Sequence, residues 1–196
     1  MGDTTSGDLW VFGYGSLMWR PGFAFAERHA ATLDGFHRAL CLYSYEHRGT
    51  EQRPGIVAGL DEGGDCRGMA FRVAASERDE VHTYLRTREL SRYCYRETFC
   101  PVTLHAPEGP KAVEALAYVV DRSHVQYCGD LPLAEKTALV LQGVGDSGTS
   151  ADYLESLVDS LEALEIHDPG LVELRVAVRR ALDNTSEVPA TSIVAT

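Results

Sequence analysis

The spacing of apolar residues changes along the chain, and this change is the feature that most constrains the fold. Up to about residue 120, apolar residues form short runs or alternate with polar ones, which is typical of β-strands. After about residue 130 they recur every three or four residues, which is typical of amphipathic helices. Strands followed by helices predict an α+β fold. We expect a mostly antiparallel sheet that closes into a small mixed barrel, with packed helices and a helical C-terminal third.

Short apolar segments bounded by glycine or polar residues mark the expected strands. They lie at residues 9–12, 36–43, 56–60, 67–73, 99–104 and 113–120. Residues 61–64 (Asp61-Glu62-Gly63-Gly64) have the composition of a hairpin turn and predict that the two strands around them pair with each other. Residues 13–22 are rich in glycine and aromatic side chains and are expected to form a loop.

Helix-start signals place one helix between the strands and three at the end of the chain. Residues 76–79 resemble a capping box, in which Ser76 caps the first turn. Pro132 suits the first position of the next helix, and Ser150 suits the cap of the helix after it. The pair Asp168-Pro169 predicts the start of the last helix.

Length and composition indicate one domain. The chain has 196 residues, of which 44% are hydrophobic and 24% are charged, as in an ordinary globular protein with a core. We expect residues 9–182 to form this domain. Residues 1–8 are polar and predict a flexible leader, and the unpatterned residues 183–196 predict a disordered tail.

The negative net charge argues against nucleic acid and anionic membranes as binding partners. The formal net charge of −11 repels nucleic acid and anionic membranes, but a local pocket can still bind a small anionic substrate. The N-terminal segment lacks the basic and apolar regions of a signal peptide, and no apolar run approaches the roughly 20 residues that span a membrane. These features predict a cytoplasmic protein that acts on a small molecule. The sequence gives no basis for naming a protein partner.

Cysteine and histidine usage argues against a metal site or a disulfide framework. The five cysteines are odd in number and include no CxxC pair, which indicates buried or inert thiols in a reducing compartment. The seven histidines show no metal-ligand spacing. We therefore expect no metal and no cofactor.

A glycine-rich motif, Gly13-Tyr14-Gly15-Ser16-Leu17, follows the first expected strand. Met18 stands where a dinucleotide fingerprint needs a third glycine, and no Walker sequence is present. Two interpretations remain: a loop whose backbone N–H groups bind an anion or a polarised carbonyl, and a simple tight turn. A nucleophilic role for Ser16 is rejected, because the motif is no GxSxG elbow and no histidine lies nearby in the sequence.

Glu89 lies at the end of the helix expected after residue 76, next to Arg88 and close to Arg86. A glutamate among arginines usually lies on a solvated helix face. If the side chain instead lies inside a pocket, it is suited to act as a general base. The spacing alone leaves both interpretations open.

Four segments, taken together and in order, resemble the ChaC-like γ-glutamylcyclotransferases, and more closely their bacterial cation-transport-regulator-like branch. They are Leu9 to Trp19, Arg48-Gly49-Thr50 with Pro54-Gly55, Arg88-Glu89 with Cys94-Tyr95, and Gly148-Thr149-Ser150 with Tyr153-Leu154. The resemblance spans about residues 9–182. It implies an enzyme that converts glutathione into 5-oxoproline and cysteinylglycine, built on the small mixed barrel of that family.

The resemblance also implies roles for individual residues. Glu89 is the expected acid and base, and the loop Tyr14, Gly15, Ser16 and Leu17 is expected to hold the γ-glutamyl group. Tyr153 is expected to add a hydroxyl contact, and Arg48 to face the glycyl carboxylate of glutathione. Two alternatives stay open: a cyclotransferase for other γ-glutamyl amines or amino acids, and a γ-glutamyl-binding module without catalysis.

Overall fold

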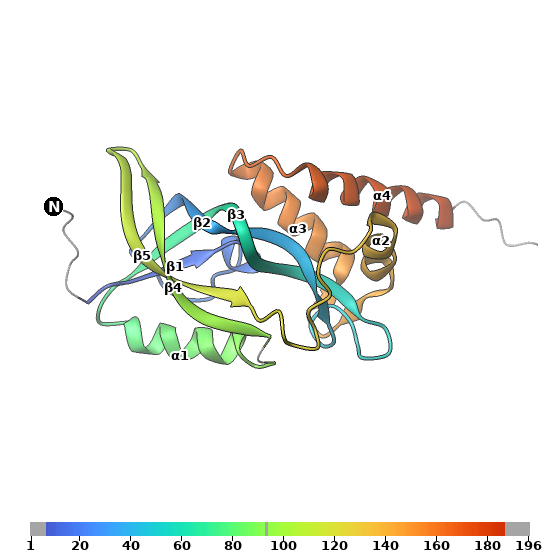
Figure 1. The fold of residues 1–196 in the computed structure, drawn as a ribbon, viewed down its shortest axis with the longest axis horizontal. Coiled ribbons are helices and arrows are strands. Elements are labelled where there is room, and N and C mark those ends of the chain that lie inside the picture. Colours follow the sequence, from blue (N-terminus) through green and yellow to red (C-terminus); the bar gives the residue numbers. More distant parts are fainter. Residues whose placement is uncertain (1–6, 93, 187–196) are drawn as a thin grey trace, which may run out of the picture.

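The structure, a computed structural model, describes residues 7–92 and 94–186 and contains a closed β-barrel (Figure 1). The barrel strands are β1 (Leu9–Gly13), β2 (Glu27–Ser44), β3 (Gly55–Val73), β4 (Tyr95–Ala106) and β5 (Gly109–Val120). Their order around the barrel is β1-β3-β2-β4-β5. Only the closing pair, β1 with β5, is parallel among these described strands, and the other pairs are antiparallel. The predicted α+β barrel is confirmed.

The predicted hairpin turn at residues 61–64 is wrong, because β3 runs through this segment without reversing. Gly63 and Gly64 have φ values of 98° and 71°, and the facing Gly35 on β2 has a φ of 86°. The pairing between β2 and β3 shifts register at this point. The glycines therefore form a bulge that bends two long strands. Bulges and turns both require residues with positive φ, so the same glycines suit either structure.

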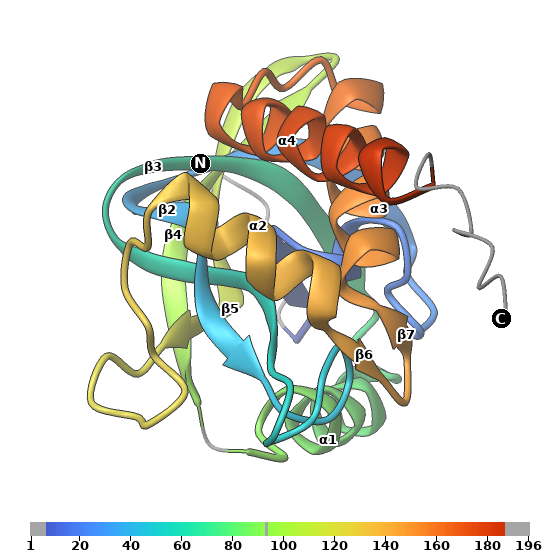
Figure 2. The same ribbon diagram turned by 90° about the vertical axis from the view of Figure 1, so that its right-hand side faces the viewer.

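Four helices cover the barrel at two separate places (Figures 1 and 2). Helix α1 lies alone along one side, whereas the other three pack together away from it. The helices are α1 (Arg78–Glu89), α2 (Leu133–Gln142), α3 (Ser150–Ala163) and α4 (Pro169–Ser186), with a short 3₁₀ helix η1 at Ser16–Met18. A two-stranded hairpin, β6 (Val144–Gly145) and β7 (Gly148–Thr149), separates α2 from α3.

Two of the predicted helix caps are wrong. Helix α1 begins at Arg78, and no side chain caps it, so Ser76 lies in the preceding turn rather than at the cap. Thr149 caps α3 in place of Ser150, because its hydroxyl accepts the Asp152 N–H at 2.9 Å. Ser150 is fully buried instead, and its hydroxyl donates to the Ile56 carbonyl at 3.0 Å. Whether a serine hydroxyl is buried depends on the tertiary structure, so a local capping pattern cannot predict it.

The other two helix starts lie close to their predicted positions. Pro132 was expected at the first position of α2 but immediately precedes it, because the helix begins at Leu133. The Asp168 carboxylate accepts the Leu171 N–H at 3.1 Å and so caps α4 as its position predicted.

Buried apolar side chains form a core inside the barrel and a second core beneath the C-terminal helices. The first contains Phe12, Leu33, Leu60 and Leu104, all nearly inaccessible to solvent. The second joins Ile56 and Phe71 of β3 to a stripe on α3 and α4. That stripe consists of Leu154, Leu157, Val158, Leu161, Leu174 and Val178. Burial of one such side chain is worth about 1.5–3 kcal/mol, so these contacts fix α3 against the barrel.

The five cysteines are free thiols, four of them buried and Cys128 half-buried. Burial raises the pKa of each one above its ordinary value. A thiol with a raised pKa is a poor nucleophile at neutral pH. The predicted burial holds for four of the five thiols, and the raised pKa values agree with the expected low reactivity.

The ends of the expected domain shift slightly. Helix α4 continues through Ser186, four residues past the expected boundary, and residues 187–196 of the expected tail lie outside the described residues. Residues 1–6 of the expected leader also lie outside them, whereas the Asp8 carboxylate accepts a bond from Arg72 at 2.7 Å. Within residues 7–92 and 94–186, no helix combines the length and apolar character needed to cross a membrane.

Candidate active site

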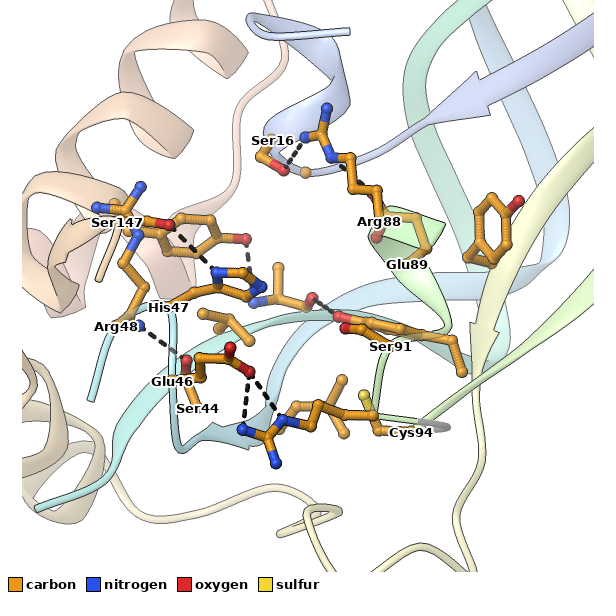
Figure 3. Close-up of a pocket in the computed structure, with 18 of the residues that line it drawn as sticks. Ser16, Ser44, Glu46, His47, Arg48, Arg88, Glu89, Ser91, Cys94 and Ser147 are labelled. Atoms are coloured by element: carbon orange, nitrogen blue, oxygen red, sulfur yellow. Dashed lines mark hydrogen bonds and ion pairs between the residues drawn. The ribbon is translucent and has the colours of Figure 1, made fainter. Parts of the chain in front are cut away.

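A cavity of about 380 Å³ opens between the loop after β1, the loop after β2, the end of α1 and the start of α3 (Figure 3). This volume lies within the range of about 300–1,000 Å³ that is usual for small-molecule sites. All seven site residues predicted from the sequence line it: Tyr14, Gly15, Ser16, Leu17, Arg48, Glu89 and Tyr153. Segments more than 130 residues apart in the sequence therefore meet at one place.

Glu89, the last residue of α1, is held in the wall of this cavity. Its side chain is 17% exposed, and its Oε1 lies 3.0 Å from Nε of Arg88. Burial raises the pKa of Glu89 above its ordinary value, and the neighbouring Arg88 opposes that rise only in part. A carboxyl that releases its proton at a higher pH than usual is a better general base near neutral pH. The solvated-face interpretation of Glu89 is therefore wrong.

Four tyrosines surround the carboxylate in the cavity wall: Tyr14, Tyr95, Tyr118 and Tyr153. Burial raises the pKa of all four, that of Tyr153 to about 12, so their hydroxyl groups stay neutral. The Tyr14 hydroxyl donates to the Tyr118 carbonyl at 2.9 Å, and the Tyr95 hydroxyl donates to the Ala58 carbonyl at 3.1 Å. These bonds fix the aromatic wall through the backbone of the barrel.

The Tyr153 hydroxyl differs from those of Tyr14 and Tyr95 because it accepts a bond. The Ala58 N–H donates to it at 3.2 Å. No acceptor for its own proton is found in the described part of the chain. The hydroxyl proton is thus available to a ligand in the cavity.

Replacing Tyr153 by phenylalanine is expected to change catalysis modestly and stability measurably. Loss of the ligand contact should raise KM or lower kcat for the substrate by about three- to tenfold, the effect of one hydrogen bond. The buried Ala58 N–H loses its partner, which costs about 1–3 kcal/mol in the free energy of unfolding. Steady-state kinetics and thermal unfolding measure the two effects.

The matched control is Tyr127→Phe, which removes a hydroxyl that donates to the Asp61 carboxylate at 2.9 Å outside the cavity. It should lower stability and leave KM and kcat unchanged. If Tyr153→Phe behaves in the same way, the Tyr153 hydroxyl is structural.

The glycine loop leaves β1 at Gly13 and turns into η1. The Met18 N–H donates to the Gly15 carbonyl at 2.9 Å, which closes this turn. A Cβ added at Gly15 would lie 3.3 Å from the Tyr153 hydroxyl, so glycine keeps this part of the cavity open. Because the loop lines the cavity, its geometry favours the binding interpretation over that of a simple turn.

Arg88 joins the glycine loop to Glu89, and the sequence pattern had given it no role of its own. Its Nη2 donates to the Ser16 hydroxyl at 2.9 Å, and its Nη1 donates to the carbonyls of Arg20 and Pro21 at 2.8 and 3.0 Å. The same side chain pairs with Glu89 through Nε. One guanidinium thus fixes the carboxylate relative to the loop (Figure 3). An arginine near a helix end carries no local signal of such a role.

The opposite side of the cavity is formed by residues 46–48, which Figure 3 shows across from Glu89. The Arg48 guanidinium donates to the Thr149 carbonyl at 3.1 Å and lies 5.5 Å from the centre of the Tyr153 ring. No carboxylate lies within ion-pair distance of Arg48 in the described ranges. Its positive charge is therefore free to attract an anionic group.

The hairpin β6–β7 holds residues 46–48 in place. The N–H groups of Asp146 and Ser147 donate to the carbonyls of Glu46 and His47 at 2.8 and 3.0 Å. The His47 ring and the Ser147 hydroxyl lie within hydrogen-bond distance, 3.1 Å, and both line the cavity. His47 is a site residue that the sequence reasoning missed, because it follows no recognisable ligand spacing.

Metal and thiol chemistry find little support in this cavity. In residues 7–92 and 94–186, no three His, Cys, Asp or Glu side chains are grouped so as to hold a metal ion. Cys94 lines the cavity, but burial raises its pKa to about 11. Glu89 lines the same cavity with a pKa raised by burial, which makes it a candidate for proton transfer.

Comparison with known proteins agrees with this geometry. Residues 9–181 match the model of the family described as "ChaC-like protein". The glutathione-specific gamma-glutamylcyclotransferase of Escherichia coli (strain K12) is 38% identical over 176 residues, covering 90% of this chain and 75% of that relative. The glutathione-specific gamma-glutamylcyclotransferase 1 of Homo sapiens is 35% identical over 159 residues, covering 79% of this chain and 70% of the human protein.

A solved structure confirms the fold. The crystal structure of the yeast gamma-glutamyl cyclotransferase specific to glutathione superposes with a TM-score of 0.80 at 22% identity, covering 89% of this chain and 97% of the yeast chain. At that identity the likeness concerns the fold alone. The match to the family model spans nearly all of the described residues, and the chain belongs to the ChaC-like protein family.

Proposed function

We propose that this protein is a glutathione-specific γ-glutamylcyclotransferase, which converts glutathione into 5-oxoproline and cysteinylglycine. The observation that carries the proposal is the half-buried Glu89 carboxylate in the cavity wall. Arg88 links this carboxylate to the glycine loop beside it. The activity named for the relatives from Escherichia coli and Homo sapiens supports glutathione as the substrate.

The proposed reaction needs one proton-transferring group and no protein nucleophile. The α-amine of the γ-glutamyl group attacks the γ-amide carbonyl, so that a new C–N bond closes the five-membered lactam. The old γ-amide C–N bond breaks and releases the amine of cysteinylglycine. Glu89 accepts a proton from the attacking amine and returns it to the leaving amine. General acid–base help of this kind is typically worth about 10²–10⁴ in rate.

The glycine loop is proposed to hold the γ-glutamyl end. Its backbone N–H groups from Gly15 to Leu17 suit the α-carboxylate or the oxyanion that develops on the carbonyl. Tyr153 supplies a hydroxyl donor beside the loop, since its proton has no acceptor in the described part of the chain. By folding the substrate so that its amine faces its own carbonyl, the cavity contributes through proximity.

The glycyl end is proposed to face Arg48. This guanidinium lines the cavity opposite Glu89 and has no carboxylate partner in the described ranges. Arginine pairs well with carboxylates. A cation at this end favours γ-glutamyl compounds that carry a second carboxylate, as glutathione does.

The proposed setting is the cytoplasm, with residues 9–182 as the catalytic domain and a small molecule as the partner. Free thiols at all five cysteines and a net charge of −11 support that setting.

The direct test is to incubate the purified protein with glutathione and to follow 5-oxoproline and cysteinylglycine by mass spectrometry. Equal amounts of the two products are expected. A panel of γ-glutamyl amines and amino acids distinguishes the alternatives. Faster turnover of one of these would replace glutathione as the substrate, and tight binding without turnover would indicate a binding module. Folded protein that turns over no γ-glutamyl compound would refute the proposal.

On the acid side, kcat/KM is expected to fall at a higher pH than an ordinary glutamate would give. Glu89 must be deprotonated to accept a proton, so activity falls as the pH falls through its pKa. Burial raises that pKa, so the midpoint should lie above the ordinary glutamate value of about 4.3. Arg88→Met removes the opposing cation and should move the midpoint further up. A wild-type midpoint at or below the ordinary value would contradict the role of burial.

A further inference from the structure

A second arginine contacts the glycine loop from outside the cavity. Arg38, on β2, donates from Nε to the Tyr14 carbonyl and from Nη2 to the Arg67 carbonyl, each at 2.6 Å. The side chain is half-buried, and it is absent from the cavity lining. Its hydrogen bonds therefore reach a ligand in the cavity by way of the loop.

The charge of Arg38 lacks an ion-pair partner among the described residues. Within residues 7–92 and 94–186 no carboxylate lies within ion-pair distance of it, whereas Arg72 on the neighbouring strand pairs with both Asp8 and Glu27. A half-buried cation that bonds only to neutral groups leaves a positive field at the loop. Such a field extends into the cavity, because a partly buried charge is weakly screened.

The bond to Tyr14 also fixes the direction of a backbone donor. The described chain contains no cis peptide bond, and in a trans peptide the C=O and N–H groups point in opposite directions. With the Tyr14 carbonyl turned toward Arg38, the Gly15 N–H is turned away from it. Gly15 lies next to Tyr153 in the cavity wall, where an added Cβ would lie 3.3 Å from the hydroxyl.

We propose that Arg38 is a positioning residue, which aims the Gly15 N–H at the α-carboxylate of the γ-glutamyl group and places a positive charge behind that peptide. A hydrogen bond from a cation to the carbonyl polarises the peptide and strengthens its N–H as a donor. The inference rests on the proposed function, because it concerns the ligand of the same site.

The test compares a charged with an uncharged ligand, because a positioning residue changes the preference between them whereas a purely structural residue does not. The product 5-oxoproline and its uncharged amide, 5-oxoprolinamide, are used as competitive inhibitors against glutathione. The wild-type protein is expected to prefer the carboxylate. Arg38→Met should raise KM for glutathione about tenfold, the equivalent of one charge-assisted hydrogen bond, with kcat changed far less. The preference for 5-oxoproline over the amide should shrink by a similar factor, and Arg38→Lys should restore part of it.

The matched control is Arg72→Met, which removes a strand arginine that bonds to Asp8 and Glu27 and not to the glycine loop. It is expected to lower the melting temperature without changing KM or the inhibitor preference. If Arg38→Met lowers the melting temperature but leaves KM and the preference unchanged, Arg38 is only a brace and the inference fails.

Two further outcomes are distinguishable. If Arg38→Met does not fold, Arg38→Gln provides the comparison, because its side-chain amide can still donate to a carbonyl but carries no charge. An unchanged KM and preference in that variant would overturn the role of the positive charge behind the Gly15 peptide. Failure of the wild-type protein to turn over glutathione defeats the proposed function instead, and inhibitor binding measured by calorimetry still reports on Arg38.

Discussion

Replacing Glu89 by glutamine is expected to lower kcat for glutathione by about 10²–10⁴-fold, the usual value of general acid–base catalysis. The amide has nearly the shape of the carboxylate but cannot accept a proton from the attacking amine. Substrate affinity should change little, since the glycine loop and Arg48 provide the binding contacts. Single-turnover kinetics, together with glutathione binding measured by calorimetry, separate the chemical step from binding.

The same variant should be at least as stable as the wild type at neutral pH. Because burial raises the pKa of Glu89, the folded state holds the proton more tightly than the unfolded state does. Stability is therefore lost as the pH rises from the unfolded pKa through the raised folded pKa. A neutral glutamine escapes this loss, so its melting temperature should equal or exceed that of the wild type at pH 7. The difference should vanish below the ordinary glutamate pKa.

Glu97→Gln is the matched control for Glu89→Gln. Glu97, on β4, is 19% exposed and pairs with Arg86, which lies on α1 as Glu89 does. Unlike Glu89, it does not line the cavity. Its replacement should leave kcat near the wild-type value. A Glu89→Gln variant that keeps near-normal kcat would remove Glu89 from the mechanism, whatever its effect on binding.

Replacing Gly145 by alanine is expected to destabilise the protein by about 3 kcal/mol, at the upper end of overpacking effects. A Cβ at this position would overlap the Glu46 carbonyl oxygen and lie 2.6 Å from the His47 carbonyl carbon and 2.7 Å from the Arg48 nitrogen. These are backbone atoms, so no side chain can swing aside to relieve the overlap. The hairpin β6–β7 must move away from residues 46–48. Denaturant unfolding measures this loss.

The displacement should also reach the cavity, because residues 46–48 form its wall opposite Glu89. KM for glutathione is expected to rise more than kcat falls, since Arg48 moves while Glu89 stays in place. Ser147→Ala in the same hairpin is the control: it removes only the contact with His47 at 3.1 Å and should cost well under half as much stability. Equal stability of Gly145→Ala and wild type would show that the hairpin is not held against this loop.

The sequence by itself determined the class of the fold and the candidate residues of the site. The change from strand-like to helix-like spacing near residue 120 predicts the α+β arrangement, because apolar spacing follows directly from the period of each element. The glycine loop from Tyr14 to Leu17 is also local, since it follows a strand and contains glycines where the chain turns. The ordered motifs that include Arg48, Glu89 and Tyr153 gave the expected site residues, all of which line the cavity.

Local signals failed where one residue type serves two backbone geometries or two burial states. Gly63 and Gly64 suit a turn and a bulge equally, and only the pairing of β3 with β2 along its whole length selects the bulge. Ser150 has the composition of a cap, but its hydroxyl is buried against Ile56, so Thr149 takes the capping position.

Only the tertiary structure decided which charges act at the site. Glu89 and Arg88 sit among other arginines in the sequence, and nothing in their spacing distinguishes a solvated carboxylate from a half-buried one. Folding α1 against the barrel removes water from Glu89, which raises its pKa, and places Arg88 against Ser16. Arg38 had no recognisable motif at all, because its role depends on a carbonyl that lies 24 residues away in the chain. Burial and long-range contacts are properties of the packed molecule, and local sequence carries no direct record of them.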